Sequence, residues 1–371
     1  MTKTVGIFHP AMNVCGGAEF VAVQIIKALK EAKYKVIILT DKKIDKTKIK
    51  KIFDVDLTFD QNILFPFAFF PSTDLHNLYS DILRCYLLRS KCDFVIDAFS
   101  NALLPAVDMS YIHFPLLGRI ENNFRSNLFF SPYIAYSAKR KRRSKESSDT
   151  ERMVMANSEY TANSIKSFHN ISANVLYPPI SSSAFNNDDQ ISKSTRNDWV
   201  VTVARISEIK MLEKIPQIAE LTSERIKFFI VGLLESKKAL DLIYDEIKKS
   251  GVSDRVKVLV NLPKNDLNEL LHKSKVYLHS AVGEHFGISI AEAMSCGCIP
   301  VVHDSGGPKE FVSKEFRYVS IEDAAKKTEK AVFAWTPEYS RQMVNSAKNF
   351  SEEQFSKKFL KLFESFLDTR S

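Results

Sequence analysis

Short apolar runs alternate with helix-length stretches along the chain, and this alternation occurs in two series. In the first, an apolar run at 5–8 meets a Gly16-Gly17 turn, and apolar residues at helical spacing then lead to a second run at 36–39. This order is typical of a strand, a helix and a parallel strand. Further runs occur at 94–96, 107–112 and 154–156. We therefore expect a parallel sheet wrapped by helices.

A second series begins after a polar stretch that is rich in serine, asparagine and aspartate. Its strand-like runs are 199–203, 228–231, 256–260, 276–278 and 299–302. The last segment places four phenylalanines on one helical face: Phe355, Phe359, Phe363 and Phe366. The sequence thus predicts an α/β chain with two doubly wound Rossmann-like domains and a C-terminal helix. The expected boundaries are 1–180, a linker at 181–198, 199–350, and a helix at 351–371.

Length and composition agree with two globular domains facing a central cleft. The chain has 371 residues, of which 45% are apolar and 26% charged. No apolar run is long enough to span a bilayer, and the N-terminus shows no signal-peptide pattern, so we expect a cytoplasmic protein. The five cysteines lack metal-site spacing and are expected to be reduced. A net charge of +8 favours anionic partners, among them nucleotides, phospholipid headgroups and nucleic acid.

The strongest motif follows the run at 276–278, where a loop with an acid and a glycine leads into a helix. Backbone N–H groups at such a helix start suit a phosphate or a sugar hydroxyl. Glu284 and Glu292 are eight residues apart, and their carboxylates can accept hydrogen bonds from a donor sugar. A surface acid and a solvated helical glutamate are the alternative. Arg205 and Lys210 follow 199–203 and also have two interpretations, as diphosphate ligands or as plain surface charges.

Two weaker features lie in the first domain. The Gly16-Gly17 turn allows close approach of a ligand to the backbone, although it is neither a dinucleotide fingerprint nor a P-loop. His113 lies at the carboxyl end of a predicted strand, the edge where α/β proteins build their sites. It either donates to a sugar hydroxyl or caps the strand structurally.

Together the motifs resemble family 4 of the GT-B glycosyltransferases, and within it the eukaryotic mannosyltransferases that extend dolichol-linked oligosaccharides, especially the α-1,2-mannosyltransferases. The matches span both domains in order: Phe8-His9-Pro10, Asn13, Gly16-Gly17-Ala18-Glu19, Tyr111-Ile112-His113-Phe114-Pro115, Tyr177-Pro178-Pro179, Arg205, Lys210, Glu284-His285-Phe286-Gly287-Ile288, Glu292 and Ser305-Gly306-Gly307-Pro308. The resemblance implies a GT-B fold whose C-terminal helix packs back toward the first domain. Its N-terminal domain would bind the acceptor, and its C-terminal domain the nucleotide sugar.

The resemblance also implies residue roles. Glu284 and the backbone of His285, Phe286, Gly287 and Ile288 would contact the donor sugar and diphosphate, and Glu292 the ribose. Arg205 and Lys210 would hold the diphosphate, His113 would touch the transferred sugar, and Gly16 and Gly17 would admit phosphate and acceptor. The family retains anomeric configuration and needs no metal or other cofactor. The expected partners are a nucleotide-diphosphate sugar, with GDP-mannose favoured, and a lipid-linked glycan acceptor. The spanning helix of its eukaryotic relatives is missing, so membrane attachment is expected to be peripheral.

A basic run predicts peripheral binding to an anionic membrane. It holds six cations in seven residues: Lys139, Arg140, Lys141, Arg142, Arg143 and Lys145. Each cation near an anionic leaflet contributes about 1 kcal/mol, so the run favours peripheral docking on the inner face of the membrane. The apolar stretch at 63–70 is a second candidate. The alternatives are a solvated basic face and a buried loop, and no nucleic-acid motif accompanies the charge.

Three rival functions are compatible with parts of the sequence. A metal-dependent, single-domain glycosyltransferase would need an acidic motif, for which Asp54-Val55-Asp56 supplies the letters in an unsuitable context. A sugar-nucleotide epimerase would use the same fold and act without an acceptor. A non-catalytic sugar-nucleotide-binding protein is the third, although Glu284, Glu292, Arg205 and Lys210 occurring together argue against it.

Overall fold

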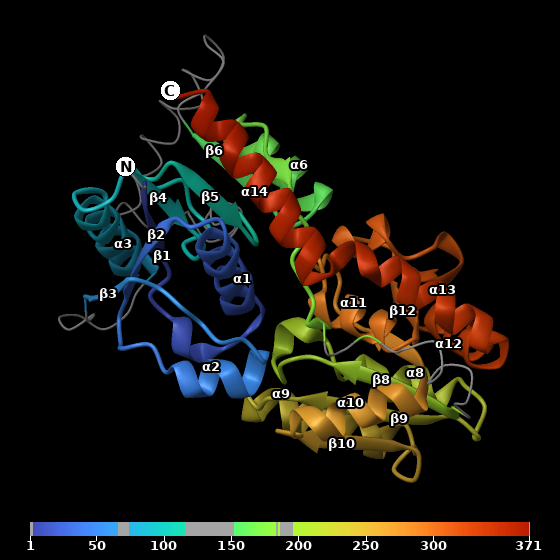
Figure 1. The fold of residues 1–371 in the computed structure, drawn as a ribbon. Helices are drawn as coiled ribbons and strands as arrows, with labels where there is room; N and C mark the ends of the chain where they lie inside the picture. Colours follow the sequence, from blue (N-terminus) through green and yellow to red (C-terminus); the bar gives the residue numbers. More distant parts are fainter. Residues whose placement is uncertain (1–2, 66–73, 116–151, 183–184, 186–195, 371) are drawn as a thin grey trace. The chain divides into compact units, whose positions relative to one another are not determined.

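The computed structural model describes residues 3–65, 74–115, 152–182, 185 and 196–370. Two compact units make up the chain: Met1–Pro179 with Glu352–Ser371 forms the first, and Ile180–Ser351 the second (Figure 1). Each unit is a parallel sheet with helices packed against it, as the two series of apolar runs predict.

The first unit holds a seven-stranded parallel sheet in the order β3-β2-β1-β4-β5-β6-β7. Because β1 and β4 are neighbours in the sheet, the strand order reverses between them, and α/β proteins bind ligands at the carboxyl ends of strands at such a point. The strands are β1 Thr4–Phe8, β2 Lys35–Thr40, β3 Gln61–Leu64, β4 Phe94–Asp97, β5 Met109–Ile112, β6 Met153–Ala156 and β7 Asn174–Val175.

Alternate residues of the first sheet enter two separate cores. Val5 and Ile7 of β1 pack in the core formed with α1, whereas Phe8 joins the core formed with α3. A Cβ at Gly6 would lie 2.6 Å from Leu88, so glycine lets α3 approach the strand. Within the described residues, the helices of this unit are η1 Met12–Val14, α1 Gly17–Glu31, α2 Lys46–Phe53, α3 Asp74–Arg89, α6 Glu159–His169 and α14 Glu352–Asp368.

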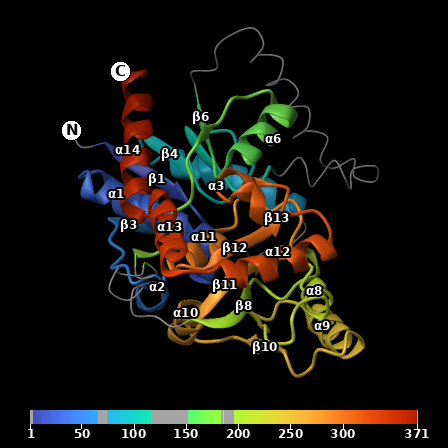
Figure 2. The ribbon, with the colours of Figure 1, turned by 90° about the vertical axis from the view of Figure 1, so that its right-hand side faces the viewer.

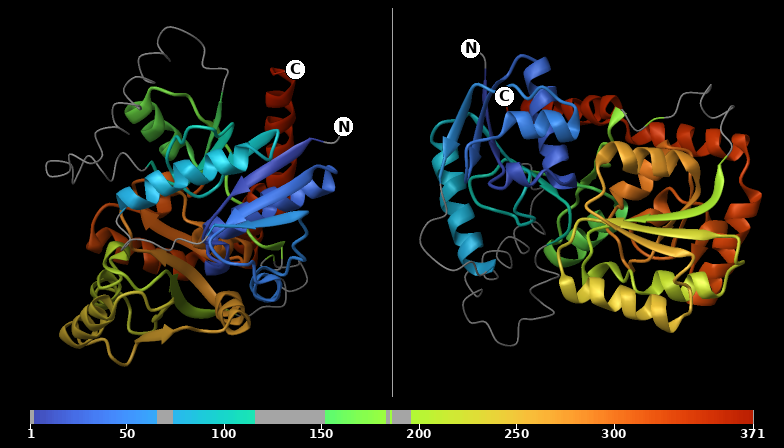
Figure 3. Two further views of the ribbon diagram at one scale, coloured as in Figure 1. Left: turned by 90° about the vertical axis from the view of Figure 1, so that its left-hand side faces the viewer. Right: turned by 90° about the horizontal axis from the view of Figure 1, so that it is seen from below.

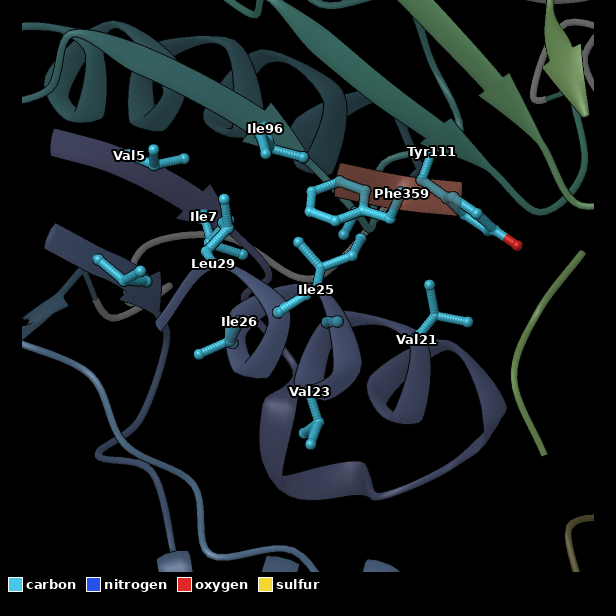
Figure 4. Close-up of a cluster of buried hydrophobic side chains, with 14 of the residues drawn as sticks. Val5, Ile7, Val21, Val23, Ile25, Ile26, Leu29, Ile96, Tyr111 and Phe359 are labelled. Atoms are coloured by element: carbon cyan, nitrogen blue, oxygen red, sulfur yellow. The ribbon is translucent and has the colours of Figure 1, made fainter. Parts of the chain in front are cut away.

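The C-terminal helix α14 belongs to the first unit, as expected. Its phenylalanine stripe is buried, with Phe359 fully enclosed and stacked 5.9 Å from Phe363. Figure 4 shows the Phe359 ring beside Ile25 of α1 and Ile96 of β4. Residues more than 300 positions apart in the chain thus share one core.

The second unit holds a six-stranded parallel sheet in the order β10-β9-β8-β11-β12-β13. Its order reverses between β8 and β11, and helices cover both faces (Figure 3). Helix α12 packs along β11, β12 and β13 (Figure 2). The strands are β8 Asn197–Val203, β9 Lys227–Gly232, β10 Val256–Val260, β11 Ser274–His279, β12 Ile299–His303 and β13 Arg317–Tyr318.

Helices of the second unit connect these strands and follow the last of them. They are η5 Glu208–Lys210, α8 Lys214–Glu220, α9 Lys237–Lys249, α10 Lys264–Lys273, α11 Ile288–Ser295, η6 Gly307–Glu310, η7 Lys314–Phe316, α12 Ile321–Ala334, α13 Pro337–Ala347 and η8 Lys348–Phe350. Within the described ranges, no helix combines the length and the apolar character that crossing a bilayer requires. All five cysteines are free thiols, and four of them are buried.

The predicted strands are present, most of them one or two residues longer than their apolar runs. β10 matches its run, and β11 is three residues longer. β5 is shorter than its run, because it begins at Met109 rather than at 107. β3, β7 and β13 were not predicted. β7 and β13 have only two residues each, too few for an apolar pattern, and β3 has the half-exposed sequence Gln-Asn-Ile-Leu.

Candidate functional site

Two neighbouring strands of the second unit end beside one another. β8 and β11 run parallel, with Val200 paired to Val276 and Val201 to Tyr277. Because the carboxyl ends of parallel neighbours meet at one edge of a sheet, the loops that follow them lie close together. Lys210 ends η5 after β8, and Glu284 lies in the loop after β11.

The Glu284 carboxylate is the centre of a compact polar cluster. Its Oε2 lies 2.6 Å from Lys210 Nζ and 3.3 Å from His279 Nε2, and its Oε1 accepts from the His285 backbone N–H at 3.1 Å. His279 is buried at the end of β11. We call Lys210, His279 and Glu284 the acid–cation cluster.

The cluster keeps Glu284 ionised. Burial alone would raise the pKa of this carboxyl, but the adjacent His279 and Lys210 outweigh burial and hold the pKa well below its usual range. A charged carboxylate accepts hydrogen bonds from hydroxyl groups, and a lysine ammonium attracts phosphate oxygens. Such a pair can therefore bind a ligand that carries both groups.

Three glycines fix the position of the Glu284 loop. Gly307 N–H donates to the Glu284 carbonyl at 2.8 Å, and Gly283 N–H donates to Ser305 Oγ, also at 2.8 Å. A Cβ at Gly306, whose φ is +74°, would lie 2.1 Å from that same carbonyl oxygen. Only glycine fits here, since it needs no space for a side chain and tolerates positive φ.

Helix α11 begins immediately after this loop. Gly287 caps it in a left-handed conformation with φ of 89°, and Ile288 is its first residue. Phe286 is buried, with its ring 5.1 Å from Phe311, which fixes the loop from the core side. Burial lowers the pKa of His285. The turn and helix predicted from the Gly287 motif are confirmed.

Glu292 lies on α11 and has an unusual environment. Burial raises the pKa of its carboxyl to about 7, partly opposed by the positive charge of Lys264. The Tyr277 hydroxyl donates to Val203 O and lies 2.8 Å from Ser289 Oγ. It is close enough to interact electrostatically with both Glu284 and Glu292. Perturbed carboxyls gather at functional sites, which makes this edge a candidate.

Arg205 takes part in a different interaction. Its Nη1 forms an ion pair with Glu235 Oε1 at 2.9 Å, and the Arg205 side chain is 58% exposed. The adjacent Ile206 is fully buried and pairs with Leu234 in an isolated bridge. Because Ile206 faces inward, Arg205 faces outward. The structure therefore brings Lys210 to Glu284 but joins Arg205 to Glu235.

The predicted residues of the first unit lie at the carboxyl edge of its own sheet. Gly16 caps α1, and its N–H donates to Glu19 Oε2 at 2.6 Å, while Gly17 begins the helix. Glu19 Oε1 also lies 3.6 Å from Nε2 of the buried His9. Burial, followed by the nearby charge of His113, lowers the pKa of His9 to about 3. His9, which follows β1, and His113, which follows β5, therefore lie near each other at the carboxyl edge of the first sheet.

Two other sequence predictions have different outcomes. The basic run from Lys139 to Lys145 lies outside the described residues, as do 66–70 of the apolar stretch. In the acidic motif, Asp54 is the C-cap of α2 with φ of 58°, and Asp56 forms an ion pair with Lys50 at 2.8 Å. No arrangement of three or more His, Cys, Asp or Glu side chains in the described part of the chain could hold a metal ion.

Sequence reasoning missed His279. It follows the apolar run at 276–278 directly, which is the same signal that singled out His113 after β5. A polar residue directly after the apolar run of a buried parallel strand is therefore the signal that points to His279.

Comparison with known proteins decides what kind of domain holds this cluster. A family model described as glycosyl transferases group 1 matches residues 184–350, which cover almost all of the second unit. The second unit is a group 1 glycosyltransferase domain. The acid–cation cluster thus lies within this glycosyltransferase domain. Together with relatives that are named as mannosyltransferases, the domain identifies the chain as a glycosyltransferase.

Relatives and solved structures extend the similarity of the glycosyltransferase domain to the whole chain. A Dictyostelium discoideum protein named GDP-Man:Man(3)GlcNAc(2)-PP-Dol alpha-1,2-mannosyltransferase is 23% identical over 98% of this chain and 85% of its own length. The human protein of that name is 28% identical over 57% of this chain, but the match spans only 48% of the human protein. Anabaena HepE, solved with UDP and glucose, is 15% identical with a TM-score of 0.71, covering 98% of this chain and all of HepE. This confirms the GT-B fold.

Proposed function

We propose that the chain transfers mannose from GDP-mannose to a lipid-linked glycan. The proposal rests on the ion pair between Lys210 Nζ and Glu284 Oε2, which lie 2.6 Å apart at the carboxyl edge of the sheet in the glycosyltransferase domain. A nucleotide-diphosphate sugar offers a negative diphosphate for the ammonium and hydroxyls for the carboxylate. The relatives named above support mannose and the dolichol-linked acceptor.

Residue roles follow from the chemistry of each group. Lys210 neutralises the charge that grows on the departing diphosphate, and Glu284 accepts from donor-sugar hydroxyls. The Glu292 carboxylate accepts from the ribose, and the backbone from His285 to Ile288 contacts the donor. Arg205 contributes to diphosphate binding once it leaves Glu235. His113 donates to the transferred sugar, and the Gly16-Gly17 turn admits phosphate and acceptor.

Transfer proceeds with retention of anomeric configuration. The bond between the anomeric carbon and the β-phosphate oxygen breaks while the acceptor oxygen bonds to the same face of that carbon. The acceptor proton passes to the departing phosphate oxygen, which leaves as GDP. Positioning and charge stabilisation are then the main contributions of the protein, and no metal takes part.

The test uses the purified full chain with radiolabelled GDP-mannose or UDP-glucose, each with and without a dolichol-linked Man3GlcNAc2 acceptor. We expect label in the lipid product only with GDP-mannose plus acceptor, unchanged by a metal chelator. Label in lipid from UDP-glucose would correct the donor, and loss of transfer with chelator would require a metal. Conversion of GDP-mannose without acceptor would favour the epimerase, and binding without turnover the non-catalytic protein.

We propose that the enzyme acts at the cytoplasmic face of a membrane, where the basic run from Lys139 to Lys145 would dock on anionic lipid. Sedimentation with vesicles of neutral or anionic lipid tests this. We expect salt-sensitive binding to anionic vesicles, which is lost when the six cations of the run are replaced by glutamine. Equal binding by the replaced chain would assign docking to another surface.

A further inference from the structure

The backbone around His113 is held by an asparagine from another loop. Asn101 Oδ1 accepts from the N–H of His113 at 2.7 Å and from the N–H of Phe114 at 3.2 Å. On the opposite side, Asn157 Nδ2 donates to the His113 carbonyl at 2.9 Å. The peptide groups on both sides of His113 are therefore fixed by side chains that follow the two strands neighbouring β5, which are β4 and β6.

Asn101 is itself held in a rare conformation. Its φ is +56°, a left-handed value that asparagine, aspartate and glycine adopt most readily. Its Nδ2 donates to Phe99 O at 2.9 Å. The same loop is tied to the buried Asp97, whose Oδ1 accepts from Phe99 N and Ser100 N, each at 2.9 Å. The acceptor that faces His113 thus stands on a rigid loop.

We infer that Asn101 is a positioning residue, which sets the direction of the His113 side chain by gripping the His113 and Phe114 amides. This inference rests on the proposed role of His113 in transfer. A group that donates to a reacting sugar must be held within a fraction of an ångström, and a displacement of about 1 Å can lower a rate about 100-fold. The Tyr111 ring, 4.9 Å from the His113 ring, packs beside it but supplies no such bond.

Three variants separate the acceptor from the backbone conformation. Asn101→Gly keeps the left-handed conformation and removes the acceptor. Asn101→Asp keeps the left-handed conformation and the acceptor, but it loses the donation to Phe99 O and adds a negative charge. Asn170→Gly is the matched control, because Asn170 has a φ of 57° at the end of α6, in the same unit. We expect kcat for mannosyl transfer to fall about 100-fold in Asn101→Gly and to stay within about fivefold in Asn101→Asp and Asn170→Gly.

Hydrogen exchange measures, without any substrate, how strongly Asn101 holds the His113 and Phe114 amides. We expect exchange of the His113 and Phe114 amides to accelerate about tenfold or more in Asn101→Gly, while Tyr111 within β5 stays protected. Adding Asn101→Gly to His113→Ala should lower kcat no further, because the two residues act as one unit.

The outcomes are distinct. Unchanged amide exchange, wild-type kcat in Asn101→Gly, or an Asn101→Asp variant as slow as Asn101→Gly each overturns the inference. Additive effects of Asn101→Gly and His113→Ala overturn it too. A wild-type chain that transfers no sugar instead overturns the proposed function, and the exchange measurement still decides whether Asn101 grips the backbone.

Discussion

Lys210 Nζ and Glu284 Oε2 lie 2.6 Å apart, although 74 residues separate them in the chain. Each side chain is about four-fifths buried, so each charge depends on the other for compensation. His279 approaches the same oxygen at 3.3 Å. A ligand that binds here must therefore replace or share an existing ion pair, which ties recognition to the geometry of the cluster.

Removing either charge of the pair should slow transfer strongly. We expect Lys210→Ala and Glu284→Ala each to lower kcat by about 100-fold to 1,000-fold, the usual loss when one stabilising group is removed from an active site. Circular dichroism should show an intact fold. Lys249→Ala, an exposed lysine of α9 paired with Glu246, is the control and should keep full activity. Near-normal turnover in either site variant would remove that residue from the mechanism.

Gly306, which contacts the Glu284 backbone, should not tolerate a side chain. In Gly306→Ala, the new Cβ would lie 2.1 Å from the Glu284 carbonyl, so the loop must move. We expect a loss of about 2–4 kcal/mol in unfolding free energy, together with loss of donor binding.

Gly251→Ala provides the matched control for that substitution. Gly251 also has positive φ, at +66°, yet a Cβ there would meet nothing within 4 Å. It should cost only about 1 kcal/mol and leave binding unchanged. Urea denaturation and calorimetric titration with GDP measure both effects. Equal effects of the two alanines would show that backbone strain, rather than contact with Glu284, matters.

The Glu292 carboxyl should make stability depend on pH. Its pKa is raised by burial from 4.5 to about 7, so between these values the folded protein keeps a proton that the unfolded chain loses. The unfolding free energy should therefore fall as pH rises from 4.5 to 7 and level off above 7. Glu292→Gln should lack this part of the slope, whereas Glu338→Gln, on the exposed side of α13, should keep it.

Urea denaturation at several pH values between 4.5 and 8 checks this difference. The same titration bears on ligand binding, because only the ionised carboxyl is a full acceptor for ribose hydroxyls. GDP affinity in the wild type should rise through pH 7, and the Glu292→Gln variant should lack that rise. Parallel stability profiles for the wild type and Glu292→Gln would mean that the carboxyl is already ionised in the folded protein.

The first unit should depend on the C-terminal helix for its stability. Phe359 is fully buried between Phe355 and Phe363 of the same helix, and it packs in the core of the first sheet. Phe359→Ala should cost about 3–5 kcal/mol, the usual range for removing a buried ring. Lys358→Ala, exposed on α14, is the control. Thermal unfolding of both variants tests this, and an unchanged melting temperature in Phe359→Ala would contradict the buried position.

The sequence predicts the fold well because buried parallel strands need continuous apolar runs. That rule finds β1 or β10 directly but cannot find β7 and β13, whose two residues are placed by the strands beside them. The site is only partly predictable. Glu284 stands out because a glycine turn and a helix follow it. The outward direction of Arg205 depends on Ile206 facing the core, and the grip of Asn101 on His113 depends on contacts across loops.

The position of α14 has a consequence for biosynthesis. The ribosome makes this helix only after the whole second unit, Ile180–Ser351, has been translated. Until then, the surface of the first sheet that receives Phe355, Phe359 and Phe363 stays uncovered. The second unit emerges during this time and can complete its own core. Chaperones that shield apolar surface on nascent chains would act on the earlier half of this protein rather than on the half made last.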